Sequence, residues 1–185
     1  GRVSQDLDTV IDARVRPPAL PAFLALLANL GFMSAGVSPG EVAHRFERGS
    51  VHVDVLGPDG LGGQSDLRTV GTATTIQVGG GTQALQRAER LPARHGDRVV
   101  HVPRPNLLGA IVVKAAAVHN DPHPQRHVRD VAFLCSIVAD PRAMRADMTA
   151  KDLQRIRAVT NLDDLTSEAW QLLVDPELGY TAFRI

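Results

Sequence analysis

The feature that most constrains the fold of this chain is a pair of carboxylates near its start. Asp6 and Asp8 flank Leu7 and run into the β-branched segment 9–11. Alternation with a period of two predicts a β-strand that projects both aspartates from one face, roughly 7 Å apart at ~3.3 Å rise per residue. Two such carboxylates repel each other unless a cation lies between them, and Mg²⁺ prefers hard oxygen ligands. The segment therefore predicts either a strand that carries a metal site or a solvated strand edge or turn.

Composition sets the class of protein. The chain has 185 residues with 44% hydrophobic content, enough for one well-buried core and a small helical appendage. Charge is balanced at 20 basic and 20 acidic residues, so no overall field draws the chain to nucleic acid or membrane. The single cysteine, Cys135, lies in an apolar run and cannot form a disulfide within the chain, which is typical of a reducing cytoplasm. Without a signal-peptide pattern or an apolar run near 18 residues, we expect a cytoplasmic protein with no membrane partner.

The order of the predicted elements indicates an α+β fold, a mixed sheet flanked by helices and followed by a helical C-terminal part. After the opening strand, further strands are predicted at 42–46, 51–56, 72–78 and 98–102, with 47–50 as a hairpin connection and 57–71 as a glycine-rich loop. Helices are predicted at 19–30, 82–91, 107–118, 128–139, 151–159 and 166–173. Pro103 and Pro105 are expected to end the last strand. Near 103–106 the predicted secondary structure changes from mixed strands and helices to helices alone. This change predicts an α/β core at 1–104 and a helical part at 105–185.

A third carboxylate, Asp54, alternates with valines in the segment 51–56. The valines would face the core, and Asp54 would lie on the opposite face with His52. If this strand lies beside the first, three carboxylates converge from neighbouring strands. The alternative is that Asp54 is a polar residue on a solvated face.

Lys114 is the only charge in the apolar helix predicted at 107–118. It either extends its ammonium to the surface or points into a site where an anion offsets its desolvation. Asp130, at the start of the next apolar helix, either complements the helix dipole or pairs with Lys114 and holds it in place. Arg126 and Arg129 are available to bind phosphates or to face solvent.

Together these segments resemble the nucleotidyltransferase superfold, and within it the AbiEii/AbiGii-type toxin nucleotidyltransferases, including the MenT-like group. The resemblance covers about residues 2–140. It depends on the Arg-x-Ser-x-Asp-Leu-Asp strand at 2–8, the strand around Asp54, and Lys114 followed by Arg129-Asp130 at a helix start. The sequence departs from the superfold at one point: the superfold has a Gly-Gly or Gly-Ser turn ahead of the aspartate pair, and the only glycine ahead of the pair here is Gly1.

The resemblance implies a role for each of these residues. Asp6 and Asp8 would bind Mg²⁺ or Mn²⁺, with Asp54 as a third ligand or as general base. Lys114 would bind the NTP phosphates, and Asp130 would orient Lys114 or contribute to the same pocket. The residues implied in nucleotide binding are Ser4, Lys114, Arg126 and Arg129.

The implied reaction transfers a nucleoside monophosphate from NTP to an acceptor hydroxyl. The resemblance implies a tRNA 3′ end as acceptor, a toxin of a toxin–antitoxin pair as the biological role, and a cognate antitoxin as partner. Two alternatives remain open: a nucleotidyltransferase that modifies an antibiotic or metabolite, and a catalytically inactive module that binds a partner or RNA.

The position of Ser4 gives one further hypothesis. Ser4 would share a strand face with Asp6, two residues away. Its phosphorylation would add nearly two negative charges beside the metal site and repel NTP.

Overall fold

The computed structural model describes residues 6–62 and 65–184, which form two compact units. The first unit is Gly1–Thr82 and the second is Gln83–Ile185. The division falls inside a short helix, α2 (Gly81–Gln86), and so precedes the change that the sequence indicates at 103–106. Each unit has its own hydrophobic core, and each is described separately.

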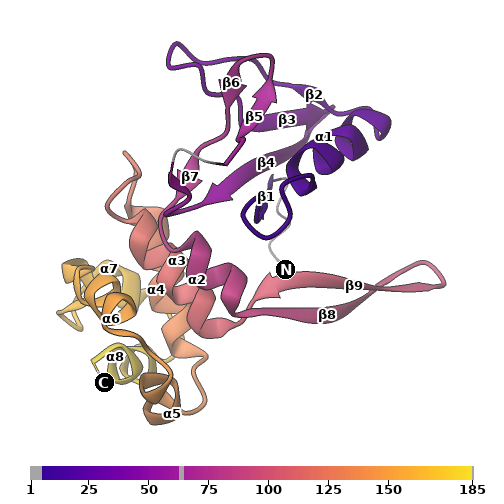
Figure 1. Cartoon of the computed structure of the whole chain (residues 1–185). Helices are drawn as coiled ribbons and strands as arrows, with labels where there is room; N and C mark the ends of the chain where they lie inside the picture. Colours follow the sequence, from indigo (N-terminus) through magenta and orange to yellow (C-terminus); the bar gives the residue numbers. More distant parts are fainter. Residues whose placement is uncertain (1–5, 63–64, 185) are drawn as a thin grey trace. The chain divides into compact units, whose positions relative to one another are not determined.

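The first unit is a mixed sheet with one helix. Its strands and helix are β1 (Asp6–Val10), α1 (Ala19–Asn29), β2 (Met33–Ser34), β3 (Arg45–Arg48), β4 (Val51–Pro58), β5 (Arg68–Val70), β6 (Ala73–Thr74) and β7 (Gln77–Val78). The sheet order is β1-β4-β3-β2, and β7 also pairs with β4. Strand β1 is parallel to β4, whereas β3 is antiparallel to both β4 and β2 (Figure 1). The expected α+β class with a mixed sheet flanked by helices is therefore confirmed.

The core of the first unit lies between α1 and one face of this sheet. Leu20 and Leu27 of α1 pack with Phe46 of β3 and with Val53 and Val55 of β4. Val53 and Val55 face the core as predicted, since alternate residues of a strand point to opposite faces, whereas Val51 at the start of β4 is exposed. The polar residues between them are thereby left on the other face of the sheet.

The β3–β4 hairpin is tighter than expected. Its turn needs only Gly49 and Ser50, and Gly49 adopts a φ of 61°. Glycine adopts this left-handed conformation without steric cost, which favours two-residue hairpin turns. The predicted strand at 42–46 is therefore wrong in its bounds, because β3 extends up to the turn. Likewise, the predicted loop at 57–71 contains the end of β4 and all of β5, and the strand predicted at 72–78 is divided into β6 and β7.

The second unit is a two-stranded hairpin followed by packed helices. Its remaining elements are β8 (Ala88–His95), β9 (Arg98–Pro105), α3 (Leu107–Ala117), α4 (Gln125–Ser136), α5 (Pro141–Ala146), α6 (Ala150–Arg157), a 3₁₀ helix at Thr160–Leu162, α7 (Glu168–Gln171) and α8 (Pro176–Arg184). The hairpin extends away from the helices of its own unit (Figure 1). Trp170 is fully buried among the helices and makes edge-to-face contacts with Tyr180 and Phe183.

The hairpin corrects two predictions. The helix predicted at 82–91 ends at Gln86, and the chain reverses at Gly96, with φ of 59°, and Asp97. Strand β9 also continues through Pro103 and Pro105. A two-stranded ribbon leaves half of its N–H groups unpaired, so proline is tolerated at those positions.

Two local features fix the packing of the second unit. Thr149 and Asp152 form the capping box of α6, and Asp152 is fully buried with its Oδ2 atom 2.7 Å from Nη2 of Arg87. Gly179 lets α8 lie close to its neighbours, because a Cβ atom there would be 2.8 Å from Cζ3 of Trp170 and 3.2 Å from Cβ of Ser136.

Among the helices of the described residues, none combines the length and the apolar character needed to cross a membrane.

Candidate functional site

Three carboxylates share one face of the β1–β4 pair. Asp8 and Asp54 are register partners on these parallel strands, and Asp6 is the partner of His52. Paired residues on neighbouring strands point to the same face, so Asp6, Asp8 and Asp54 lie on the face opposite α1. Asp6 and Asp8 are exposed, while the side chain of Asp54 is 13% exposed. The prediction that the strand of Asp54 lies beside the first strand is therefore confirmed, whereas convergence of the three carboxylates on one metal ion stays a prediction.

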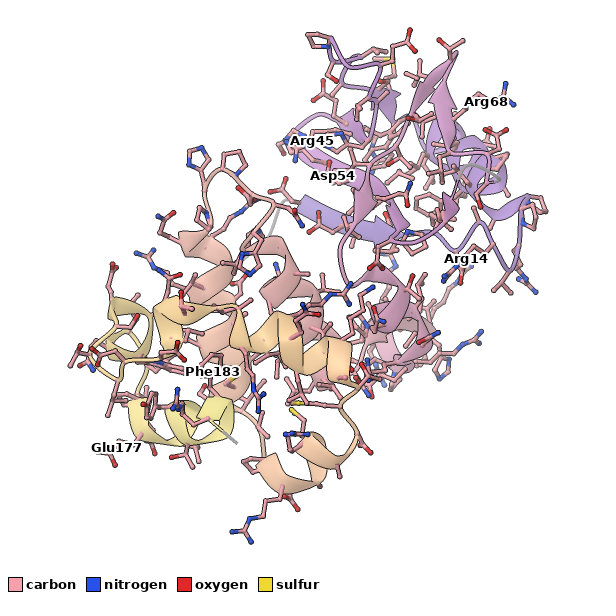
Figure 2. The ribbon with its side chains drawn as sticks, turned by 60° about the vertical axis from the view of Figure 1, so that its left-hand side comes forward. Arg14, Arg45, Asp54, Arg68, Glu177 and Phe183 are labelled. Atoms are coloured by element: carbon pink, nitrogen blue, oxygen red, sulfur yellow. The ribbon has the colours of Figure 1, made fainter. Side chains whose placement is uncertain are left out.

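A guanidinium that the sequence analysis did not single out holds one of these carboxylates. Arg45 donates from Nε to Oδ1 of Asp54 at 2.8 Å and from Nη2 to Oδ2 at 2.7 Å, a bidentate pair (Figure 2). These hydrogen bonds and the charge of Asp54, followed by the charges of Asp6 and Asp8, raise the pKa of Arg45 above its ordinary value. The four groups form one electrostatic cluster in which carboxylates outnumber the cation.

The donor set suits a hard cation only in part. Carboxylate oxygens on one face are the ligands that Mg²⁺ prefers. Within residues 6–62 and 65–184, however, no three side chains of His, Cys, Asp or Glu are grouped closely enough to hold a metal ion together. Both oxygens of Asp54 accept hydrogen bonds from Arg45, so Asp54 would have to change partner to bind a metal. The metal role of Asp6, Asp8 and Asp54 stays a prediction.

His52 is a second neighbour of the carboxylates. It lies beside Asp6 on the same face, and its Nδ1 atom is 3.7 Å from Oε2 of Glu47. The signal for both His52 and Arg45 was present in the sequence. A two-residue turn at Gly49 and Ser50 places Arg45 directly opposite Asp54, and the strand around Asp54 carries His52 two residues earlier.

Lys114 and Asp130 form an ion pair in the second unit. Nζ of Lys114 on α3 lies 2.9 Å from Oδ2 of Asp130 on α4, and each side chain is about one-third exposed. Helix α3 begins at the cap Asn106, whose Oδ1 accepts from the N–H of Gly109, and it buries Ile111 among other residues. The core fixes α3, so Lys114 stands at a defined place on its partly exposed side. The predicted pairing of Asp130 with Lys114 is confirmed.

The two arginines predicted to bind nucleotide already have carboxylate partners. Arg126 donates to Asp121, and Nη2 of Arg129 lies 2.5 Å from Oε1 of Glu168 on α7. Hydrogen bonds from the backbone N–H of His123 and from the side chains of His127 and Arg126 lower the pKa of Asp121. These arginines would have to exchange partners to bind a phosphate. Their nucleotide role stays a prediction, and Ser4 lies outside the described residues.

The candidate residues are thus distributed over both units. Asp6, Asp8 and Asp54 belong to the first unit, whereas Lys114 and Asp130 belong to the second. A catalytic site that uses both sets stays a prediction.

Comparison with known proteins adds no family assignment. No protein-family model matches the chain, and searches of curated proteins and of solved structures gave no significant match. The function is therefore inferred from the residues and their geometry.

Proposed function

We propose that this protein is a Mg²⁺-dependent nucleotidyltransferase with a nucleotidyltransferase-like fold. It would transfer a nucleoside monophosphate from NTP to an acceptor hydroxyl, with loss of pyrophosphate. The observation that supports this best is the register of β1 and β4, which places Asp8 beside Asp54 and keeps Asp6 on the same face. The resemblance of the sequence at 2–8 and of the segment around Asp54 to the AbiEii/AbiGii-type enzymes points to the same reaction.

In this proposal the carboxylates hold the metal that the reaction needs. Asp6 and Asp8 would be the ligands, with Asp54 as the third once Arg45 releases it. Bound Mg²⁺ would offset the charge that develops on the phosphoryl oxygens. The alternative role of Asp54, as general base, requires a carboxylate that can accept a proton from the acceptor hydroxyl. Arg45 occupies both oxygens of Asp54, so either role requires that Arg45 first releases this carboxylate.

Lys114 would bind the NTP phosphates, and Asp130 would position it. The ion pair with Asp130, whose Oδ2 lies 2.9 Å from Nζ, restricts the rotamers that the Lys114 side chain can adopt. Lys114 would therefore lose less conformational entropy when it binds the phosphates. Arg126 lies one turn before Asp130 on the same side of α4 and could add a second cation to the phosphate site.

The biological role follows from the resemblance alone. It implies that the acceptor is a tRNA 3′ end, that the protein is the toxin of a toxin–antitoxin pair, and that a cognate antitoxin binds it. A small-molecule acceptor is the alternative for the same chemistry.

A labelling experiment tests the proposal. The protein is incubated with Mg²⁺, each α-labelled NTP in turn and total tRNA, and RNA and small molecules are then separated. We expect a tRNA extended by one to a few nucleotides, and loss of labelling in Asp8→Asn. The matched control is Asp66→Asn, which removes an exposed aspartate of the same unit that pairs with Arg68. Label on small molecules would instead support the antibiotic or metabolite reaction.

A specific observation favours one other candidate, the inactive binding module. Arg45 fills both acceptor oxygens of Asp54, as a structural ion pair would. If no NTP labels any acceptor while tRNA or NTP still binds, this candidate replaces the transferase.

A further inference from the structure

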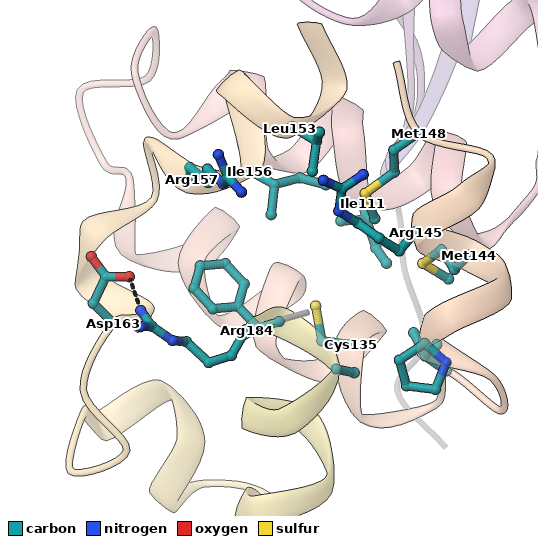
Figure 3. A pocket seen from close by; sticks show the side chains of 14 residues that line it. Ile111, Cys135, Met144, Arg145, Met148, Leu153, Ile156, Arg157, Asp163 and Arg184 are labelled. Carbon is teal, nitrogen blue, oxygen red and sulfur yellow. Dashed lines mark hydrogen bonds and ion pairs between the residues drawn. The ribbon is translucent and has the colours of Figure 1, made fainter. Parts of the chain in front are cut away.

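The second unit contains a cavity of about 360 Å³ that none of the proposed catalytic residues lines. It lies among α3, α4, α5, α6 and α8, and Figure 3 shows its lining. Its volume falls at the small end of the range of about 300–1,000 Å³ that is usual for small-molecule sites. A ligand for it would be smaller than a nucleoside triphosphate.

The inner wall of the cavity is apolar and adaptable. Cys135 of α4, Met144 of α5, Met148 after α5 and Ile156 of α6 contribute to it (Figure 3). Phe183 of α8 also lines the cavity. Burial raises the pKa of the Cys135 thiol to about 12, so this sulfur stays neutral. Methionine side chains are flexible and polarisable, and they adjust to apolar groups of differing shape. The wall suits a short hydrocarbon group.

Three arginines also line the cavity and give it a positive charge. Arg184 pairs with Asp163, the one acidic residue of the lining, at 3.1 Å. Over the part of the chain that the structure describes, no carboxylate lies within ion-pair distance of Arg145 or Arg157. Two guanidinium groups beside an apolar cavity can therefore accept an anion without first losing a partner. Planar guanidinium forks suit carboxylate and phosphate groups in particular.

We propose that this cavity binds a small amphipathic anion, with the hydrocarbon part against the methionines and the anionic head on Arg145 and Arg157. Charge complementarity and size argue for this occupant. A nucleotide would need more room and polar partners for its sugar, whereas a purely apolar ligand would leave the arginines unused. The inference is independent of nucleotidyl transfer, because the cavity shares no residue with the proposed active site.

The methionines provide a direct test. The chain has three, and Met33 in β2 of the first unit is an internal control for Met144 and Met148. With ¹³C-labelled methionine methyl groups, we titrate the full chain with octanoate below its micelle-forming concentration. Single Met→Leu variants assign the three signals. We expect saturable shifts for Met144 and Met148 and none for Met33.

Matched ligands and variants separate the explanations. Octanol has the hydrocarbon chain without the carboxylate, and acetate has the carboxylate without the long chain. Both should bind more weakly than octanoate. Arg157→Gln and Arg145→Gln should each weaken octanoate binding by about tenfold, the effect of one lost charge-assisted hydrogen bond. Arg142→Gln, which changes an exposed arginine on α5 outside the cavity, should leave binding unchanged.

Several results would overturn the proposal. Equal shifts with octanol would show that the cavity binds hydrocarbon without using the arginines. Equal shifts at Met33 would indicate non-specific association. No shift with octanoate would exclude the proposed ligand class. If a short leucine-rich peptide with a free carboxylate shifts Met144 and Met148 while octanoate does not, the cavity is a protein-docking site instead. None of these results depends on NTP, so they are distinct from a failure of the transferase assay.

Discussion

Nζ of Lys114 and Oδ2 of Asp130 lie 2.9 Å apart, which joins the only charged residue of α3 to the first carboxylate of α4. The pair is about one-third exposed, so solvent screens it and its contribution to folding is small. The ion pair therefore leaves the proposed phosphate-binding role of Lys114 open to a direct test by substitution.

Lys114→Gln tests this interpretation. We expect nucleotidyl transfer to fall by roughly 10²–10³-fold, because a charge that stabilises the phosphoryl oxygens is removed. The matched control is Lys151→Gln, which changes the only other lysine of the chain, an exposed one on α6. Transfer rates and urea midpoints of both variants are measured. Equal losses in both variants, or a normal rate in Lys114→Gln, would contradict the role.

Arg45→Gln should strengthen divalent-cation binding. The substitution removes the cation of the carboxylate cluster and frees both oxygens of Asp54. We expect Mn²⁺ to bind roughly thirtyfold more tightly, since a divalent ion and a unit charge about 4 Å apart in water repel by about 2 kcal/mol. Electron paramagnetic resonance titration of free Mn²⁺ measures this. Arg68→Gln, whose partner is Asp66, is the control. Weaker Mn²⁺ binding in Arg45→Gln would argue that the carboxylates do not form a metal site.

Asp152→Asn should destabilise the protein by about 3 kcal/mol, because it leaves the guanidinium of Arg87 without its buried partner. Burial raises the pKa of Asp152, but hydrogen bonds from Thr149 and Arg87 outweigh burial and hold it below 3.8. A depressed folded pKa means that this stability is present above about pH 4 and is lost as the pH falls through the folded value. Urea unfolding between about pH 7 and pH 3 measures both effects. Asp152→Asn should lose less stability on acidification than the native chain; an equal loss would show that other carboxylates cause it.

Cys135 should resist thiol reagents in the folded protein. Its pKa of about 12, raised by burial from 9.0, leaves roughly a thousandfold less thiolate than an ordinary cysteine has. We expect negligible reaction with iodoacetamide at about pH 8 in buffer and one equivalent per chain in denaturing urea. Rapid labelling of the native protein would show that the wall of the cavity opens.

The acidic face could be predicted because its pattern is local. Alternation in β1 and β4 determines which side chains share a face, and the valines of β4 determine which face is buried. The pairing of Asp54 with Arg45 was missed, although the hairpin register contains it. Glu168, the partner of Arg129, is 39 residues away, so only tertiary packing brings the two together.

The hairpin at 88–105 shows where local preference misleads. Ala88, Glu89 and Leu91 are good helix formers, so the sequence favours a longer α2. The turn at Gly96 and Asp97 instead pairs this segment with β9. Tertiary pairing therefore overrides propensity here.

Two short helices were missed although each has a recognisable start. Asp140 precedes Pro141 at the start of α5, and Asp175 precedes Pro176 at the start of α8. In each case the aspartate side chain accepts a backbone N–H three residues on, at 3.0 and 3.1 Å. Aspartate before proline is a usual helix start.

The missing side chain at Gly179 has a consequence for evolution of the cavity. Phe183 lies one turn further along α8 on the same side, so any substituent at 179 that lifts the helix from Trp170 also moves the phenyl ring that lines the cavity. A substitution at Gly179, which does not line the cavity, could thus change the volume of the cavity and its ligand preference. Mutational tolerance at this glycine is therefore a gauge of whether selection preserves the cavity's dimensions.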